Sequence, residues 1–157
     1  MSSELEILYQ EIILEHSRYP RNYGRLPQPT HHAEGYNPLC GDQVHLTLQV
    51  AGEAIRDIRF EGQSCAICKA SASVMTSLVK GLPLSEAEQL YEAFHTLLTA
   101  EEPPTFSHIA PKYQDYLLAF GAVRNYPMRV KCATLPWHTL HAALHESHHE
   151  PVSTENL

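Results

Sequence analysis

The sequence predicts an α+β fold, in which a small antiparallel sheet of about three strands packs against an N-terminal helix and a C-terminal set of helices. Two observations support this fold class. Apolar and polar residues alternate from Val44 to Phe60, which is the pattern of half-buried strands. On either side of this region, apolar residues recur at helical spacing. The predicted order is therefore helix, sheet, helices.

The first predicted element is an amphipathic helix over residues 4–17, where leucine and isoleucine recur at helical spacing. Three prolines between residues 20 and 29 then interrupt regular structure, and this segment is expected to run along the surface as an extended connector. Residues 31–36 are predicted to form a short strand that leads to Cys40. A hairpin follows, with one strand from Val44 to Val50 and a turn at Gly52-Glu53.

The rest of the chain is predicted to be mainly helical. Helices are expected over residues 66–80, 84–98 and 113–120 and from Pro127 to about His145, with a loop-like stretch from Thr99 to Pro111. Gly81 and Gly121 are natural stops for two of these helices. Pro136 is expected to kink the last helix, and Trp137 is expected in the core. Residues 1–157 are interpreted as one domain, with 146–157 as a flexible tail.

Charge and hydropathy exclude several classes of function. Lysine and arginine total 11 against 18 aspartates and glutamates, for a formal net charge of −7. This balance argues against nucleic acid and anionic membrane partners, both of which need a basic face. No apolar run has the length of a transmembrane helix. The N-terminus is acidic and resembles neither a signal peptide nor a transit peptide, so a cytoplasmic location is expected.

Four cysteines carry the most chemistry: Cys40, Cys65, Cys68 and Cys132. They are too few and too unevenly spaced for the disulfide framework of a secreted protein. In a reducing compartment the remaining interpretations are metal ligand, reactive thiol or buried packing residue.

Three of these cysteines suggest a metal site. Cys40 and Asp42 flank a glycine that lets the backbone turn tightly, so both side chains can reach one ion. Cys65 lies where a strand is followed by a helix, and the free amides of a helix N-terminus favour its thiolate. Cys132 lies near the start of the last helix. Three sulfurs and one carboxylate oxygen make a complete tetrahedral set for zinc.

Two cations precede Cys132, namely Arg129 and Lys131. They are expected to favour the thiolate of Cys132. They would also offset the negative charge of a site whose ligands carry about −4, or about −2 with Zn²⁺.

The residues alone leave other interpretations open. A single cysteine is often a small buried packing residue, Asp42 after a glycine is often a turn residue, and the cysteine spacing matches no zinc-finger rule. Cys65 and Cys68 form a CxxC pair as in dithiol oxidoreductases, although those usually follow a parallel strand, so a packing or spare thiol is favoured for Cys68. Four histidines also recur at helical spacing and are interpreted as solvated or as an adventitious metal patch: His138, His141, His145 and His148.

Several motifs together resemble the IscU/NifU-N superfamily, and more closely its SufU branch. The matching segments are Leu8–His16, Pro20-Arg21-Asn22, Asn37–Asp42, Cys65–Ser73 and Arg129–Trp137. The resemblance extends from about residue 5 to about residue 145.

Two features favour the SufU branch. IscU-type scaffolds have a histidine directly before the last cysteine, within a chaperone-binding region, whereas this chain has Lys131 there and residues 126–129 do not match that region. The segment between Cys65 and Cys132 is also longer than in IscU types.

The resemblance implies a zinc-dependent sulfur carrier, a sulfurtransferase of iron–sulfur cluster assembly. Its sulfur would come from the persulfide of a SufS-type, PLP-dependent cysteine desulfurase and pass to downstream assembly proteins. The implied ligands are Cys40, Asp42, Cys65 and Cys132. A histidine of the desulfurase would take over one coordination position and release Cys40 as the sulfur acceptor.

The resemblance also implies an alternative, a scaffold that holds iron or an iron–sulfur cluster on the same ligands. In either role the chain is expected to be a monomer.

Overall fold

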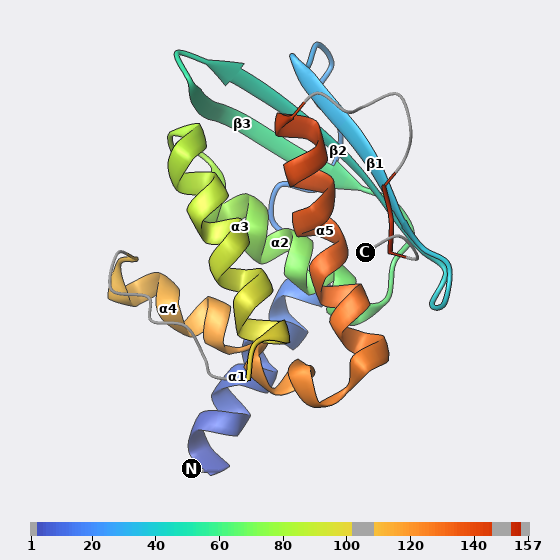
Figure 1. The fold of residues 1–157 in the computed structure, drawn as a ribbon, viewed down its shortest axis with the longest axis vertical. Helices are drawn as coiled ribbons and strands as arrows, with labels where there is room; N and C mark the ends of the chain where they lie inside the picture. The colour runs from blue at the N-terminus through green and yellow to red at the C-terminus, as the bar shows by residue number, and fades with distance from the viewer. Residues whose placement is uncertain (1–2, 102–108, 146–151, 155–157) are drawn as a thin grey trace.

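The structure is a computed structural model that describes residues 3–101, 109–145 and 152–154 (Figure 1). It confirms the α+β class. The helices are α1 (Ser3–Arg18), α2 (Ala66–Val79), α3 (Leu84–Thr99), α4 (Pro111–Leu118) and α5 (Pro127–Leu144), with a 3-10 helix η1 (Gly121–Asn125). The strands are β1 (His31–Asn37), β2 (Asp42–Ala51), β3 (Ala54–Glu61) and β4 (Val152–Ser153).

The sheet has the strand order β3-β2-β1-β4. The first three strands are antiparallel neighbours, as predicted, and β2 and β3 are joined by the expected turn, where Gly52 and Glu53 both have positive φ. The connector before β1 runs along the sheet, because Gly24 N–H donates to the Phe60 carbonyl and Thr30 N–H to the Leu48 carbonyl. β4 was not predicted. It pairs in parallel with β1 and adds a fourth strand at the edge of the sheet.

The helices lie on one side of the sheet, with α2, α3 and α5 next to one another and α1 and α4 farther from the strands (Figure 1). Apolar side chains on the helix-facing side of β2 and β3, such as Leu46, Leu48 and Ile58, are fully buried. Trp137 of α5 is a core residue, as predicted: it is 1% exposed and stacks on Phe94 of α3 with ring centroids 4.8 Å apart.

Two glycines set how closely the elements around the hairpin approach one another. A Cβ at Gly35 of β1 would collide with Thr139 and Leu135 of α5, so this glycine lets the helix lie directly on the strand. Gly62 has φ +136°, and a Cβ there would collide with the backbone of Gln43. These glycines bring α5 and the start of α2 against the hairpin tip.

The structure differs from the sequence predictions at three places. Pro111 begins α4 instead of ending a loop, consistent with the preference of proline for the first helical position. α4 ends at Leu118, and Gly121 begins η1 instead of closing the helix. Within the predicted tail, residues 152–154 are described and include β4. Residues 102–108 of the predicted loop, and residues 146–151 and 155–157 of the tail, lie outside the described residues.

No helix among the described residues is long and apolar enough to cross a membrane.

Candidate metal centre

The tip of the β1–β2 hairpin presents a thiol and a carboxylate. Asn37 and Asp42 are the last paired residues, and the Cys40 N–H donates to the Asn37 carbonyl at 3.3 Å within the turn. Gly41 adopts φ +73°, and the space where its Cβ would lie is open. Asp42 is 1% exposed, whereas Cys40 is only partly buried. The carboxylate is thus fixed inside the protein and the thiol lies at its edge.

Cys132 reaches the hairpin tip from the second turn of α5. Its sulfur is fully buried and lies 3.4 Å from the sulfur of Cys40. The Cys40 sulfur, an Asp42 oxygen and the Cys132 sulfur all lie within 4.8 Å of one another. The structure therefore brings together three of the four ligands predicted from the sequence. We call these three residues the cysteine cluster.

Cys65 lies directly beside the cysteine cluster. It caps the N-terminus of α2, where its sulfur accepts a hydrogen bond from the Cys68 N–H at 3.4 Å. Its own N–H donates to Asp42 Oδ1 at 2.8 Å, which ties the start of α2 to the predicted carboxylate ligand. The Cys65 sulfur is outside the group of atoms that lie within 4.8 Å of one another.

The pKa of Cys65 is lowered to about 7, in the direction predicted from its position at a helix N-terminus. The largest cause is a hydrogen bond with Cys132, with a smaller contribution from the Cys68 N–H and an opposing contribution from burial. The hydrogen bond with the Cys132 thiol therefore lowers the pKa of Cys65 more than the helix amides do.

The pKa of Cys132 is raised, although the interaction of Arg129 with Cys132 acts in the predicted direction, towards the thiolate. The causes are its hydrogen bond with Cys65, its burial, and its hydrogen bonds with Cys40 and Asp42. Of the two thiols, Cys65 therefore loses its proton more readily than Cys132 when no metal is bound. Arg129 is exposed, and a hydrogen bond to Cys132 raises the pKa of its guanidinium. Lys131 is half-buried in the same helix.

Asn37 is a site residue to which the sequence reasoning assigned no role. Its Nδ2 donates to Asp42 Oδ2 at 3.0 Å and to Cys132 Sγ at 3.3 Å, and its Oδ1 accepts from Thr154 Oγ1 at 3.1 Å. One fully buried amide therefore orients two predicted ligands at once. The available signal was a polar residue that precedes a proline in the turn next to Cys40.

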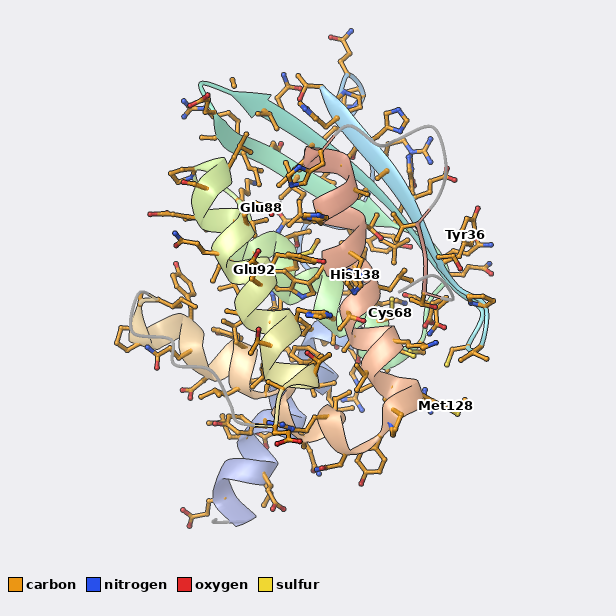
Figure 2. All side chains as sticks on the ribbon, viewed as in Figure 1. Tyr36, Cys68, Glu88, Glu92, Met128 and His138 are labelled. Carbon is orange, nitrogen blue, oxygen red and sulfur yellow. The ribbon has the colours of Figure 1, made fainter. Side chains whose placement is uncertain are left out.

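Cys68 has a different environment from the other three cysteines. It is fully buried, and burial raises the pKa of its thiol well above the usual value. It belongs to the hydrophobic core and lies beside α5 in the view of Figure 2. A protonated, enclosed thiol is a poor nucleophile, which favours the packing interpretation over the dithiol one.

The donors at the hairpin tip fit a metal ion. Thiolate sulfur with one carboxylate oxygen suits zinc, and thiolates also suit iron–sulfur clusters. Asp42 and Cys132 are buried and already have hydrogen-bond partners that orient them, as ligands of a metal site usually do.

Comparison with known proteins places this arrangement in a family. The family model described as the NifU-like N terminal domain matches residues 8–144. The zinc-dependent sulfurtransferase SufU of Bacillus subtilis is 33% identical, over 88% of this chain and 90% of its own length. The iron–sulfur cluster assembly scaffold protein IscU of Streptococcus pyogenes is 34% identical, over 92% of this chain and 87% of its own length.

A solved structure agrees with these matches. The SUF-system iron–sulfur cluster assembly scaffold protein of Fervidobacterium islandicum superposes with a TM-score of 0.77 at 34% identity, covering 88% of this chain and 98% of its own. The chain belongs to the NifU-like N-terminal domain family, the IscU/NifU-N superfamily that its motifs resemble. The relatives named SufU and IscU are nearly equal in identity to this chain, although one is a sulfurtransferase by name and the other a scaffold protein.

Proposed function

We propose that this protein is a zinc-dependent sulfur carrier in iron–sulfur cluster assembly and that Cys40 accepts the sulfur. The observation that supports this role best is the asymmetry of the cysteine cluster. Asp42 and Cys132 are buried and held by Asn37, whereas Cys40 lies partly exposed in a turn beside open space at Gly41. One predicted ligand can leave the cluster while the others stay in place.

Four residues would hold the zinc ion: Cys40, Asp42, Cys65 and Cys132. Cys65 joins the cluster in this proposal because its sulfur already contacts Cys132 and its thiol has the lowered pKa that a ligand requires. When bound, zinc would keep its cysteine ligands deprotonated at neutral pH. The carboxylate makes the set less thiolate-rich than a four-cysteine site, which favours ligand exchange.

The transfer step uses the Cys40 thiolate as nucleophile. It attacks the outer sulfur of a persulfide on a partner cysteine desulfurase of the SufS type. A new S–S bond forms on Cys40, the S–S bond of the desulfurase persulfide breaks, and its electron pair leaves with the desulfurase cysteine as a thiolate. The sulfur changes its carrier without net oxidation or reduction. Arg129 lies next to the cluster and would stabilise the anionic persulfide.

Exposed apolar side chains surround the same end of the molecule and suit a docked partner. Leu39 beside Cys40 is 56% exposed, and Tyr126 and Met128 at the start of α5 are 63% and 57% exposed. Met128 projects outward from the N-terminal end of α5 (Figure 2). Large exposed side chains of this kind are typical of interaction surfaces.

The test is transfer of labelled sulfur from cysteine, through a SufS-type desulfurase, to this protein. Cys40→Ala is expected to abolish labelling because the nucleophile is lost, whereas Cys68→Ala is expected to label like the wild type because Cys68 is enclosed. Zinc content and circular dichroism of each variant show whether the fold survives. Normal sulfur acceptance by Cys40→Ala would refute the assigned role.

A second candidate function is the assembly of an iron–sulfur cluster on the same residues. The similarity to relatives named IscU favours it, as does the general ability of thiolates to hold such clusters. Anaerobic reconstitution with iron and sulfide, followed by transfer of the intact cluster to an apo-acceptor, tests it. A stable visible spectrum and transfer of iron together with sulfur would support the scaffold, whereas sulfur transfer without iron supports the carrier.

A further inference from the structure

A second group of metal-binding side chains lies at the opposite end of α5. Glu88 comes from α3, and His141 and His145 come from the last turn of α5 and its C-cap, so the group joins two helices. One donor atom from each of the three residues lies within 4.8 Å of the others. We call these three residues the histidine cluster. It is separate from the cysteine cluster, because His141 follows Cys132 by nine residues, which corresponds to about 14 Å along a helix.

The separations between donor atoms suit a small divalent ion. His141 Nδ1 lies 3.2 Å from both carboxylate oxygens of Glu88, and His145 Nε2 lies 3.3 Å from Glu88 Oε1. Zinc binds imidazole nitrogen and carboxylate oxygen at about 2.0–2.2 Å, which places neighbouring tetrahedral ligands about 3.3–3.5 Å apart. The distances from Glu88 to each imidazole nitrogen already match this spacing, and the two imidazole donor atoms lie within 4.8 Å of each other.

The surroundings of the histidine cluster hold its side chains in place. The ring of His141 stacks on Tyr91 of α3, with centroids 4.6 Å apart and planes 11° from parallel. The Tyr91 hydroxyl in turn contacts His138 Nδ1 at 2.9 Å. The side chains of Glu88, His141 and His145 are 29%, 41% and 55% exposed, so an ion can enter from solvent. Figure 2 shows Glu88, Glu92 and His138 around the seam between α3 and α5.

We propose that Glu88, His141 and His145 form a second metal site, which binds a borderline divalent ion such as Zn²⁺. Two imidazoles and one carboxylate are a donor set for such ions. Three protein ligands leave a coordination position for water or an outside ligand. From the sequence alone these histidines are interpreted as solvated or as an adventitious metal patch, because Glu88 is distant from them in sequence. The structure adds this carboxylate from another helix, which distinguishes the cluster from histidines spread along one helix face.

The experiment is isothermal titration of Zn²⁺ into untagged protein whose cysteine cluster is already loaded with zinc. The wild type is expected to bind one further equivalent. Glu88→Gln and His145→Gln are each expected to weaken this binding at least about tenfold, since even residues that only orient a metal ligand contribute 10–100-fold to affinity. His145 is exposed, so its substitution keeps the test valid if Glu88→Gln folds poorly.

Two control variants separate this site from nonspecific binding. Glu92→Gln changes a carboxylate one turn further along α3, and His32→Gln removes an exposed histidine of β1, a strand that contributes no member of the cluster. Both are expected to bind the further zinc within about twofold of the wild type, because neither changes a ligand. The proposal is overturned if the wild type binds no further equivalent, which would make the cluster an ion-pair clamp only. It is also overturned if a control variant loses affinity as strongly as Glu88→Gln.

Discussion

The two ends of α5 present metal-binding side chains of opposite character. Near its N-terminus, Cys132 meets Asp42 and Cys40, and the first two are 0% and 1% exposed. At its C-terminus, His141 and His145 meet Glu88, and all three remain between 29% and 55% exposed. One helix thus contributes sulfur to an enclosed cluster and imidazole to an open one.

The two clusters differ in how deeply their side chains are buried and in which contacts hold those side chains in place. In the cysteine cluster a buried amide, Asn37, is bonded to two predicted ligands, Asp42 and Cys132, whereas Cys40 is only partly buried. In the histidine cluster one predicted ligand, His141, is oriented by stacking on Tyr91, and water reaches every member. We infer that the first cluster retains its metal while exchanging one ligand, and that the second exchanges its metal with solvent.

Cys132→Ser should have the largest effect, because it should lower zinc affinity at one cluster and leave the other unchanged. Losing a buried sulfur ligand is expected to lower zinc affinity at the cysteine cluster by at least about a hundredfold, because a hydroxyl is a poor zinc ligand. Zinc binding at the histidine cluster should not change. Metal analysis of untagged protein measures the first effect, and titration with zinc measures the second. Full zinc retention by Cys132→Ser would contradict the assignment of ligands.

Asn37→Ala should test whether the buried amide slows the loss of zinc from the cysteine cluster. The substitution removes the hydrogen-bond partner of Asp42 Oδ2 and of Thr154 Oγ1, at a cost of about 1–3 kcal/mol in the free energy of unfolding. It should also accelerate zinc loss to a chelator by about 10–100-fold. The matched control is Thr154→Val, which removes only the hydrogen bond to Asn37 and should cost about 1 kcal/mol. Equal effects of the two substitutions would show that Asn37 does not orient the ligands.

The pH dependence of stability should show whether the folded protein keeps His138 neutral. This residue lies between the two clusters on α5. Burial, together with repulsion from His95 and His141, lowers its pKa to about 4. The unfolded chain, with a histidine pKa near 6.5, binds a proton more readily. Stability should therefore fall as the pH decreases from about 6.5 to about 4, by roughly 2 kcal/mol from this residue. Urea midpoints of metal-free His138→Gln should decline less over the same range. An equal decline would mean that His138 is not held neutral.

Much of the fold follows from local patterns in the sequence. Alternation between Val44 and Phe60 predicts the hairpin, and the turn at Gly52-Glu53 joins its strands as expected. β4 could not be predicted, because its two residues have no periodicity and depend on pairing with β1. A strand of this length acquires its conformation from its neighbour.

The site was predictable as a set of residues but not as a set of interactions. The motif around Cys40 indicates a thiol and a carboxylate at one turn. The pKa of the Cys132 thiol, by contrast, depends most on a hydrogen bond with Cys65, a residue distant in sequence. This effect on the pKa is larger than that of the cations close to Cys132 in the sequence. The role of Glu88 beside the C-terminal histidines likewise depends on the packing of α3 against α5.

Gly35 has a consequence for any attempt to adjust the cysteine cluster. It has no side chain where β1 meets α5 at Leu135 and Thr139, one to two turns beyond Cys132. Even a methyl group at this position would collide with α5 and force the strand and the helix apart. The close approach of β1, which leads to Cys40, and α5, which carries Cys132, thus depends on a residue that contributes no ligand.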